Sequence, residues 1–146
     1  MLIREAEEND FDRLMQLYLH LHEESAPAYD GHAAEVWHTI LRDPNHHLIV
    51  CEEDGKLISS CVCVVVPNLT RGLRPYALIE NVVTHPDHRN RGLSSQCLNR
   101  AREIAKAANC YKIMLLTGSR EAATHRFYQR AGYNSTDKTA YIQWLS

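Results

Sequence analysis

The stretch YALIENVVTHPDHRNRGLSS, residues 76–95, decides the fold that the rest of the chain supports. Its first part, Tyr76 to Thr84, is mostly apolar and predicts a strand that Glu80 and Asn81 interrupt. From Leu93 onward, apolar residues recur at helical spacing on one face, while arginine, glutamate and lysine occupy the other. The stretch therefore predicts a strand, a tight basic turn and a long amphipathic helix.

Patterns on either side extend this arrangement to the whole chain. An Asp54-Gly55 pair joins two strands rich in Val, Ile and Cys, which is typical of a tight hairpin. The order strand, helix, strand over 76–116 predicts a parallel pair joined by a right-handed crossover. The expected elements are strands at 2–6, 47–51, 57–66, 76–84, 111–116 and 139–145, with helices at about 9–24, 36–41, 93–108 and 121–130. This order predicts an α/β fold, a mixed sheet with helices on both faces, in a single domain over residues 1–146.

The length, composition and net charge of the chain limit the kinds of partner that we expect it to bind. With 146 residues and 45% apolar composition, the chain is long enough for one core. Its longest apolar run, Cys61 to Val66, is far short of the roughly 20 residues of a membrane span. A net charge of -2 argues against nucleic acid, so we expect a compact ligand and no membrane partner. The N-terminal residues lack the basic start and apolar middle of a secretory signal, so we expect a cytoplasmic location.

The five cysteines and nine histidines predict neither a disulfide framework nor a metal site. The cysteines are odd in number and lack a Cys-x-x-Cys pair, which favours reduced thiols in the core. Among the histidines, His20 and His22 point to different faces of a helix, and those at 46–47 and 85–88 join no cysteine or carboxylate cluster. We therefore expect no metal.

The turn within residues 85–95 leads from a strand into a helix, where several unpaired backbone N–H groups converge. The helix dipole adds about half a positive charge there. Arg89 and Arg91 add whole charges, and Gly92 lets an anion approach the backbone closely. A pyrophosphate suits such a turn, although the local residues fit an ordinary basic helix cap equally well. The turn lacks the glycine patterns of dinucleotide folds and of P-loops.

Two segments resemble motifs of the GNAT superfamily of N-acetyltransferases. Residues 80–86, followed by Arg89-Asn90-Arg91-Gly92-Leu93-Ser94, are similar to its central Arg/Gln-x-x-Gly-x-Gly/Ala motif, with the final serine in place of a glycine or alanine. Residues 119–133 are similar to its late Ala-x-x-Phe-Tyr-x-x-x-Gly-Phe/Tyr pattern. Here Thr124 replaces the alanine, and Glu121 stands where an asparagine often helps to hold the cofactor. The resemblance implies a mixed, mostly antiparallel sheet with a splayed central parallel strand pair.

The resemblance also implies acetyl-CoA as cosubstrate, bound between the strands at 76–84 and 111–116. Backbone groups of Val82, Val83 and Thr84 would then bind the pantetheine arm, with the Val82 N–H donating to the thioester oxygen. The pyrophosphate would lie on the turn, which is formed by Arg89, Asn90, Arg91, Gly92, Leu93, Ser94 and Ser95.

Glu80 and Tyr128 are the expected catalytic residues. Glu80 is an ionisable group in an apolar strand, a setting that suits a general base. It would remove a proton from the acceptor amine, directly or through water. Alternatively, it faces solvent or pairs with an arginine such as Arg74. The resemblance implies that Tyr128 hydrogen-bonds the departing thiolate, and the alternative is a half-buried tyrosine that closes the last helix.

The expected acceptor is a primary amine of a small molecule, and its class stays open. The Glu80 strand and residues 109–113 are similar to small enzymes that acetylate glucosamine 6-phosphate, and Arg71 and Arg74 are candidates for its phosphate. Acidic residues at 23, 24 and 30 favour instead a cationic amine or a lysine side chain. Protein-lysine or N-terminal acetylation is an alternative within the enzyme class, and a non-catalytic acyl-CoA sensor is an alternative outside it. Apolar residues on both faces of the last expected strand indicate a possible homodimer.

Overall fold

The computed structural model describes residues 1–21 and 23–146. These residues divide into two compact units, Met1–Leu115 and Leu116–Ser146, so the single domain over the whole chain stays a prediction. His22, one of the histidines considered for a metal site, lies outside the described residues. Within the described ranges, every helix is too short or too polar to cross a bilayer, and no group of three or more His, Cys, Asp or Glu side chains is arranged to hold a metal ion.

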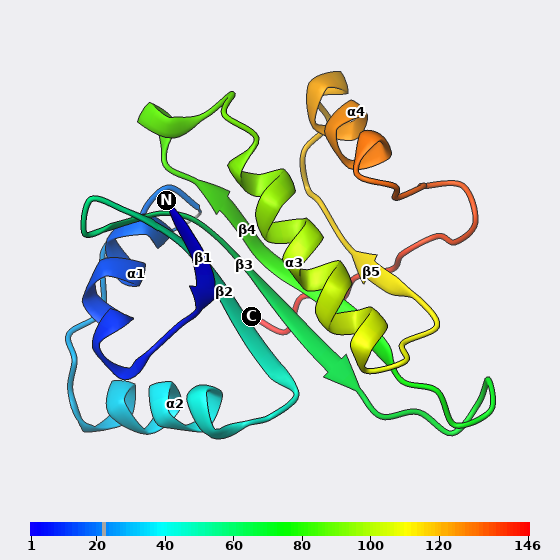
Figure 1. Ribbon diagram of the computed structural model, residues 1–146, viewed down its shortest axis with the longest axis horizontal. Coiled ribbons are helices and arrows are strands. Elements are labelled where there is room, and N and C mark those ends of the chain that lie inside the picture. Colours follow the sequence, from blue (N-terminus) through cyan, green and yellow to red (C-terminus); the bar gives the residue numbers. More distant parts are fainter. Residues whose placement is uncertain (22) are drawn as a thin grey trace. The chain divides into compact units, whose positions relative to one another are not determined.

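The first unit is built on a five-stranded sheet in the order β1-β2-β3-β4-β5 (Figure 1). Neighbouring strands are antiparallel from β1 to β4, and β4 and β5 are parallel. This confirms the predicted mostly antiparallel sheet with one parallel pair. The elements of the first unit are β1 (Leu2–Glu5), η1 (Glu8–Asp10), α1 (Phe11–Tyr18), α2 (Gly31–Arg42), β2 (His46–Glu53), β3 (Lys56–Val66), β4 (Tyr76–Thr84), η2 (Pro86–His88), α3 (Leu93–Ala107) and β5 (Ile113–Leu115). The second unit contains the helix α4 (Ala122–Arg130).

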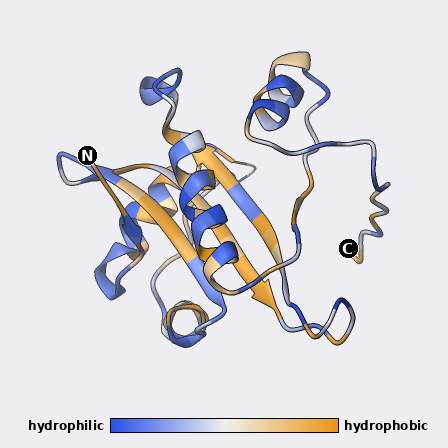
Figure 2. Cartoon of the chain, turned by 45° about the vertical axis from the view of Figure 1, so that its right-hand side comes forward, coloured by the Kyte–Doolittle hydropathy of each residue, from blue (hydrophilic) through white to orange (hydrophobic). Residues whose placement is uncertain are grey.

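Helices cover both faces of the sheet, as predicted. On one face, Leu48 of β2 and Val62 of β3 belong to a core cluster with Phe11 and Leu14 of α1 and Trp37 of α2. On the other face, α3 packs against β2, β3 and β4. The strands of the sheet are largely hydrophobic (Figure 2). Successive side chains of a strand point to opposite faces, so the long, mostly buried strand β3 contributes to the cores on both sides.

The turns of the first unit follow local signals in the sequence. Between β2 and β3, Asp54 and Gly55 both have positive φ, 50° and 75°, as in the two-residue hairpin turn that matches the twist of its strands. Asp30 caps the N-terminus of α2 and accepts a hydrogen bond of 2.8 Å from the Ala33 N–H. After α3, Asn109 adopts the left-handed conformation, φ 63°, that commonly ends a helix.

A buried aspartate ties the start of α1 to the sheet. The Asp10 side chain is fully buried and accepts hydrogen bonds from Arg4, at 2.6 and 3.0 Å, and from Arg13. Both arginines also donate to Glu52 of β2, Arg4 at 2.7 Å and Arg13 at 3.0 Å. Asp10 further accepts a hydrogen bond of 2.7 Å from the Glu7 N–H. The four charged side chains of this cluster thus alternate in sign.

Several elements differ from those expected; helix α2, for example, covers Gly31–Arg42 instead of about 36–41. Within the described residues no strand forms over 139–145, because a strand needs the backbone of a neighbour and the sheet ends at β5. Helix α1 ends at Tyr18 rather than near residue 24, since His20 and Leu21 continue the chain with tighter i→i−3 hydrogen bonds. Strand β5 covers only Ile113–Leu115 of the expected 111–116.

All five cysteines are free thiols, and Cys51, Cys61, Cys63 and Cys97 are buried, which confirms the expected reduced core. Burial raises the pKa of the Cys63 and Cys97 thiols to about 11, so both are neutral at pH 7 and poorly nucleophilic. We expect only the half-buried Cys110 to react quickly with a chromogenic disulfide reagent in the native protein, and all five cysteines to react in denaturant. Rapid reaction of several thiols in the folded protein would contradict this core.

Candidate active site

Strand β4 carries a bulge in its middle. Its pairing with β3 is regular up to Glu80 and resumes at Val83, so Asn81 and Val82 together oppose the single residue Cys61. Asn81 has a φ of 52°, a left-handed conformation that asparagine tolerates better than most residues. Such a bulge leaves the ladder locally incomplete and re-aims the neighbouring side chains. The polar interruption noted in the sequence is therefore a break in strand pairing.

The bulge coincides with the end of the pairing between β4 and β5. The parallel ladder ends at Ile79 and Leu115, whereas β4 continues to Thr84. In the part of the chain that the structure describes, residues 80–84 therefore have no partner on β5. Residues 82–84, the expected contacts of the pantetheine arm, belong to this open edge.

Tyr18, the last residue of α1, reaches the bulge from the helical layer. The side chains of Asn81 and Ser60 hydrogen-bond with its hydroxyl. Burial raises the pKa of Tyr18 to about 12, although these hydrogen bonds oppose the rise, so the phenol is neutral at pH 7. Sequence reasoning placed Tyr18 in an apolar core stripe. Helical spacing gives no sign that its hydroxyl contacts β4.

The turn after β4 has a backbone conformation that suits an anion. Asn90 and Gly92 have positive φ, 62° and 72°, and Gly92 is the N-cap residue of α3. No described side chain caps this helix, so its first backbone N–H groups lack intrahelical partners. A Cβ built at Gly92 would meet no atom within 4 Å. The space in front of the helix is therefore open at this residue.

The two arginines of the turn differ in their surroundings. Arg91 forms a bidentate ion pair with Glu53 of β2, at 2.8 and 2.9 Å, and lies 2.8 Å from Nδ1 of His88. It braces the turn against the β2–β3 hairpin, and Glu53 balances its charge. Arg89 is exposed and, within the described part of the chain, has no carboxylate partner. Of the two expected cations, Arg89 is the one whose charge is available to a ligand.

Ser94, the departure from the family motif, is held by a chain of hydroxyl groups. Its Oγ lies 2.5 Å from Oγ1 of Thr84, which lies 2.8 Å from Oγ of Ser59. The Ser59 hydroxyl donates to the Val83 carbonyl at 3.0 Å, and the Cys97 thiol donates to Ser59 at 3.7 Å. The chain joins the end of β4 to the first turn of α3, so the serine hydroxyl is satisfied by the strand.

A cavity of about 530 Å³ lies between α1, α2 and the sheet, and Glu80 and Asn81 line it at the bulge. The Glu80 side chain is exposed, as in the alternative that it faces solvent, and the strand opens into the cavity at this point. The alternative pairing with Arg74 does not occur, because Arg74 donates to the carbonyls of Asn109 and Cys110, each at 3.2 Å.

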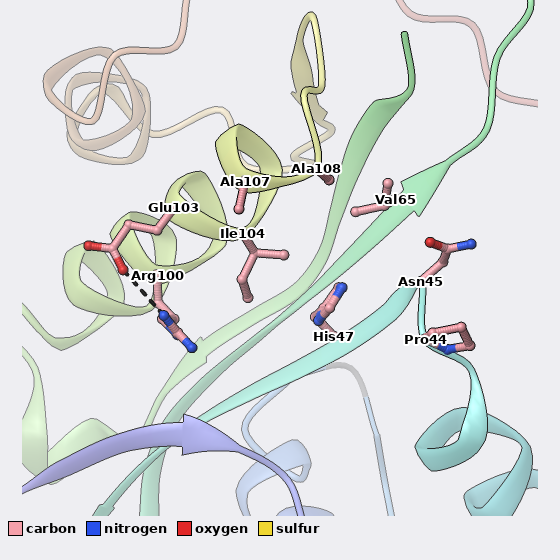
Figure 3. Close-up of a pocket in the computed structure, with 9 residues that line it drawn as sticks. All are labelled: Pro44, Asn45, His47, Val65, Arg100, Glu103, Ile104, Ala107 and Ala108. Atoms are coloured by element: carbon pink, nitrogen blue, oxygen red, sulfur yellow. Dashed lines mark hydrogen bonds and ion pairs between the residues drawn. The ribbon is translucent and has the colours of Figure 1, made fainter. Parts of the chain in front are cut away.

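A second hollow, of about 570 Å³, lies beside α3 (Figure 3). His47 and Val65 line it from the strands, and Arg100 and Glu103 of α3, joined by an ion pair of 3.4 Å, line it from the helix. The described residues that line it include none of those expected for catalysis or cofactor binding. It is therefore not part of the candidate active site.

Tyr128 lies on α4 in the second unit. Its ring is half-buried and contacts Phe127 and Tyr133 edge-on, with ring centroids 5.0 and 6.2 Å away. Its carbonyl accepts a hydrogen bond of 3.0 Å from the Tyr133 N–H. The aromatic residues of the late motif thus form one cluster. The placement of the Tyr128 hydroxyl at a thioester stays a prediction.

Comparison with known proteins gives the class of the molecule. Residues 11–133 match the model of the Acetyltransferase (GNAT) family. A glucosamine 6-phosphate N-acetyltransferase of Trypanosoma brucei brucei is 28% identical over 138 residues, which cover 93% of this chain and 90% of that protein. A solved structure from Agrobacterium tumefaciens str. C58, provisionally named an acetyltransferase, is 37% identical, with a TM-score of 0.90 and coverage of 99% of this chain and 100% of that one.

The chain belongs to the GNAT family of acetyltransferases and is an N-acetyltransferase by class. Members of this family use acetyl-CoA. An aminoglycoside N-acetyltransferase solved in complex with CoA shares the fold, with a TM-score of 0.77 at 15% identity and coverage of 99% of this chain and 100% of that one. Among named relatives, this chain is similar to the glucosamine 6-phosphate N-acetyltransferase of Trypanosoma brucei brucei.

Proposed function

We propose that this chain transfers the acetyl group of acetyl-CoA to a primary amine of a small molecule by direct attack in a ternary complex. One arrangement carries the proposal. The bulged, open edge of β4 leads from the cavity at Glu80 to the turn at Gly92. A single strand thus connects a cavity for the acceptor with an anion site for the donor, so both substrates can be bound at once, as direct transfer requires.

The turn fits the pyrophosphate of acetyl-CoA. Unpaired backbone N–H groups and the dipole of the 15-residue helix α3 favour an anion there. In the proposed complex, residues 89–95 surround the pyrophosphate, and Arg89 contributes its available charge. Arg91 keeps its ion pair and holds the turn in shape. Residues 82–84 bind the pantetheine arm through their backbone, and the Val82 N–H, next to the bulge, donates to the thioester oxygen.

The reaction needs a neutral amine, a polarised carbonyl and a stabilised leaving group. Glu80 faces the cavity and takes the proton of the acceptor ammonium, directly or through water. The amine nitrogen bonds to the thioester carbon, and the C–S bond breaks with its electrons on sulfur. The second proton of the nitrogen passes to the sulfur as CoA thiol forms, and the Tyr128 hydroxyl hydrogen-bonds this leaving group. The Val82 N–H stabilises the charge on the carbonyl oxygen, and such a donor is worth about 3 to 4 kcal/mol in the barrier.

Two assays on the same sample test the proposal. Calorimetric titration with acetyl-CoA measures donor binding, and a free-thiol release assay then measures transfer to sugar amines, polyamines, amino acids and lysine peptides. Binding with release stimulated by a small amine supports the proposal. Binding without release favours the acyl-CoA sensor, and release with lysine peptides alone favours protein acetylation. Absence of binding would overturn the proposal.

We expect Tyr128→Phe to lower the turnover number by about 100-fold, with the dissociation constant of acetyl-CoA nearly unchanged. The change removes the donor to the thiolate and keeps the ring in its aromatic cluster. Steady-state kinetics and calorimetry measure the two quantities. Tyr141→Phe is the matched control, since Tyr141 is 92% exposed in the same unit and should leave both quantities unchanged. An unaltered turnover number in Tyr128→Phe would reject this role.

We also propose that two copies of the chain associate through residues 139–145. The apolar side chains of this segment are exposed, Tyr141 at 92%, Trp144 at 80% and Leu145 at 93%. Apolar residues on both faces of a strand at 139–145 would suit burial against a second copy. Sedimentation velocity over a range of concentrations should show a dimer, and Trp144→Ser should shift it toward the monomer. A concentration-independent monomer would contradict the proposal.

A further inference from the structure

The side chains that line the cavity beside Glu80 favour one chemical class of ligand. Its volume of about 530 Å³ lies in the range of small-molecule sites, which are mostly apolar with a few polar groups that fix orientation. Met15 of α1, Trp37 and Ile40 of α2 and Val64 of β3 are among its apolar walls. The polar groups on the β4 side of the cavity are Glu80, Asn81 and the Tyr18 hydroxyl, which hydrogen-bonds with the Asn81 side chain.

The charged side chains that line the cavity are acidic. Glu80 and Asp30 both line it, and the described lining residues include no lysine or arginine. Two histidines are also present, His32 and His46. Burial lowers the pKa of His46, so its imidazole is neutral at pH 7. The cavity therefore attracts an ammonium group and offers a phosphate no strong cation.

The arginines that were candidates for a phosphate are engaged elsewhere. The Arg71 guanidinium lies 5.3 Å from the centre of the Tyr111 ring. Arg74 donates to the carbonyls of Asn109 and Cys110. Both arginines thus hold the connection between α3 and β5, and neither lines the cavity. A phosphorylated acceptor placed in this cavity would bring its charge close to apolar and acidic side chains, with no lysine or arginine among the described lining residues to balance it, which is unfavourable.

We infer that the acceptor is a primary amine carried on an apolar body, such as an aromatic ring on a short alkyl chain, and not a phosphorylated amino sugar. This inference rests on the proposed function and specifies the acceptor. The ammonium group lies beside Glu80 and Asn81, and the apolar body packs against Met15, Trp37 and Val64. The acceptor then differs from that of the trypanosomal relative, because specificity follows the lining of the cavity, whereas the family likeness follows the fold and the cofactor turn.

The experiment compares three acceptors on the whole chain by free-thiol release. We expect kcat/KM for 2-phenylethylamine to exceed that for glucosamine 6-phosphate by a factor of about 100, with unphosphorylated glucosamine as a third acceptor. A ratio below about 10 overturns the inference and leaves the proposed function intact. Acetyl-CoA binding with no release for any amine overturns the proposed function itself, and the inference with it.

A pair of variants on α2 locates the effect in the cavity. Val36 lines it and is 46% exposed, so Val36→Lys adds a cation there with little strain on the core. We expect it to lower kcat/KM for 2-phenylethylamine by about 10-fold or more and to leave acetyl-CoA binding unchanged. Thr39→Lys adds the same charge to an exposed position of the same helix that does not line the cavity, and should change kcat/KM by less than about twofold. Equal effects of the two variants would place the acceptor outside this cavity.

Discussion

Glu80→Gln should lower kcat/KM at neutral pH by about 100-fold or more, with the dissociation constant of acetyl-CoA unchanged. The amide keeps the size and the position of the side chain at the cavity and removes the ability to accept a proton. An alkylammonium acceptor has a pKa near 10.4, so almost all of it is protonated at pH 7 and transfer depends on the base. The measurement is the pH dependence of kcat/KM for the wild-type protein and the variant.

The pH dependence distinguishes a base from a residue that only positions the acceptor. As the pH rises toward the pKa of the amine, the neutral form becomes abundant and the deficit of Glu80→Gln should shrink. A deficit that is constant with pH would assign Glu80 a positioning role instead. Glu103→Gln is the control, because Glu103 is an exposed carboxylate on α3 that is outside the site. Its kinetics should match those of the wild-type protein.

Asp10→Asn should lower the free energy of unfolding by about 3 to 5 kcal/mol and the melting temperature by roughly 10 °C. The Asp10 carboxylate is fully buried between two arginines, so the amide leaves Arg4 and Arg13 with Glu52 as their one carboxylate partner among the described residues. Thermal and urea unfolding measure the loss. Asp12→Asn is the matched control, since Asp12 is exposed in the first turn of α1, the helix that Asp10 precedes, and it should cost less than about 1 kcal/mol. Equal losses in the two variants would contradict the role of the buried cluster.

The same cluster predicts how stability depends on pH. Burial tends to raise the pKa of Asp10, but the hydrogen bond from Arg4, the Glu7 N–H and the positive charges of Arg4 and Arg13 lower it below the ordinary value of 3.8. A carboxyl whose pKa is lowered on folding contributes stability that is fully present above its unfolded pKa and is lost as the pH falls through the folded value. The advantage of the wild-type protein over Asp10→Asn should therefore persist at pH 5 to 7 and decline below about pH 4.

The features that the sequence predicted correctly depend on residues close together in the chain. The Asp54-Gly55 turn needs two successive residues with positive φ, and the start of α3 needs a glycine at its N-cap. Periodicity over one helix or strand is likewise a local signal. For this reason the hairpin, the tight turn before α3 and the helices on both faces could be predicted from the sequence. The family motifs lie on such local elements.

The features that sequence reasoning missed depend on contacts between distant segments. The bulge at Asn81 arises from the register of β4 against β3, and it leaves Glu80 at an open cavity rather than in a core. Tyr18 belongs to the apolar stripe of α1, but its hydroxyl hydrogen-bonds with Asn81 at the bulge, a contact that the spacing of the stripe does not reveal. The segment 139–145 is rich in residues that favour strands, but within the described chain it forms none. The sequence pattern of a strand is the same whether or not a neighbouring strand is available to pair with it.

The sequence by itself determined the order of elements from β1 to α4, the N-acetyltransferase class and the tight turn before α3, because each depends on short runs of residues such as that from Arg89 to Ser94. Only the tertiary structure decided which charges are available to a ligand. Arg91 pairs with Glu53 across 38 positions of sequence, Arg74 holds backbone carbonyls after α3, and α1 and α2 line the Glu80 cavity with apolar side chains. Which side chains form ion pairs or pack together depends on how close they lie in space, and residues far apart in the sequence come close only when the chain folds.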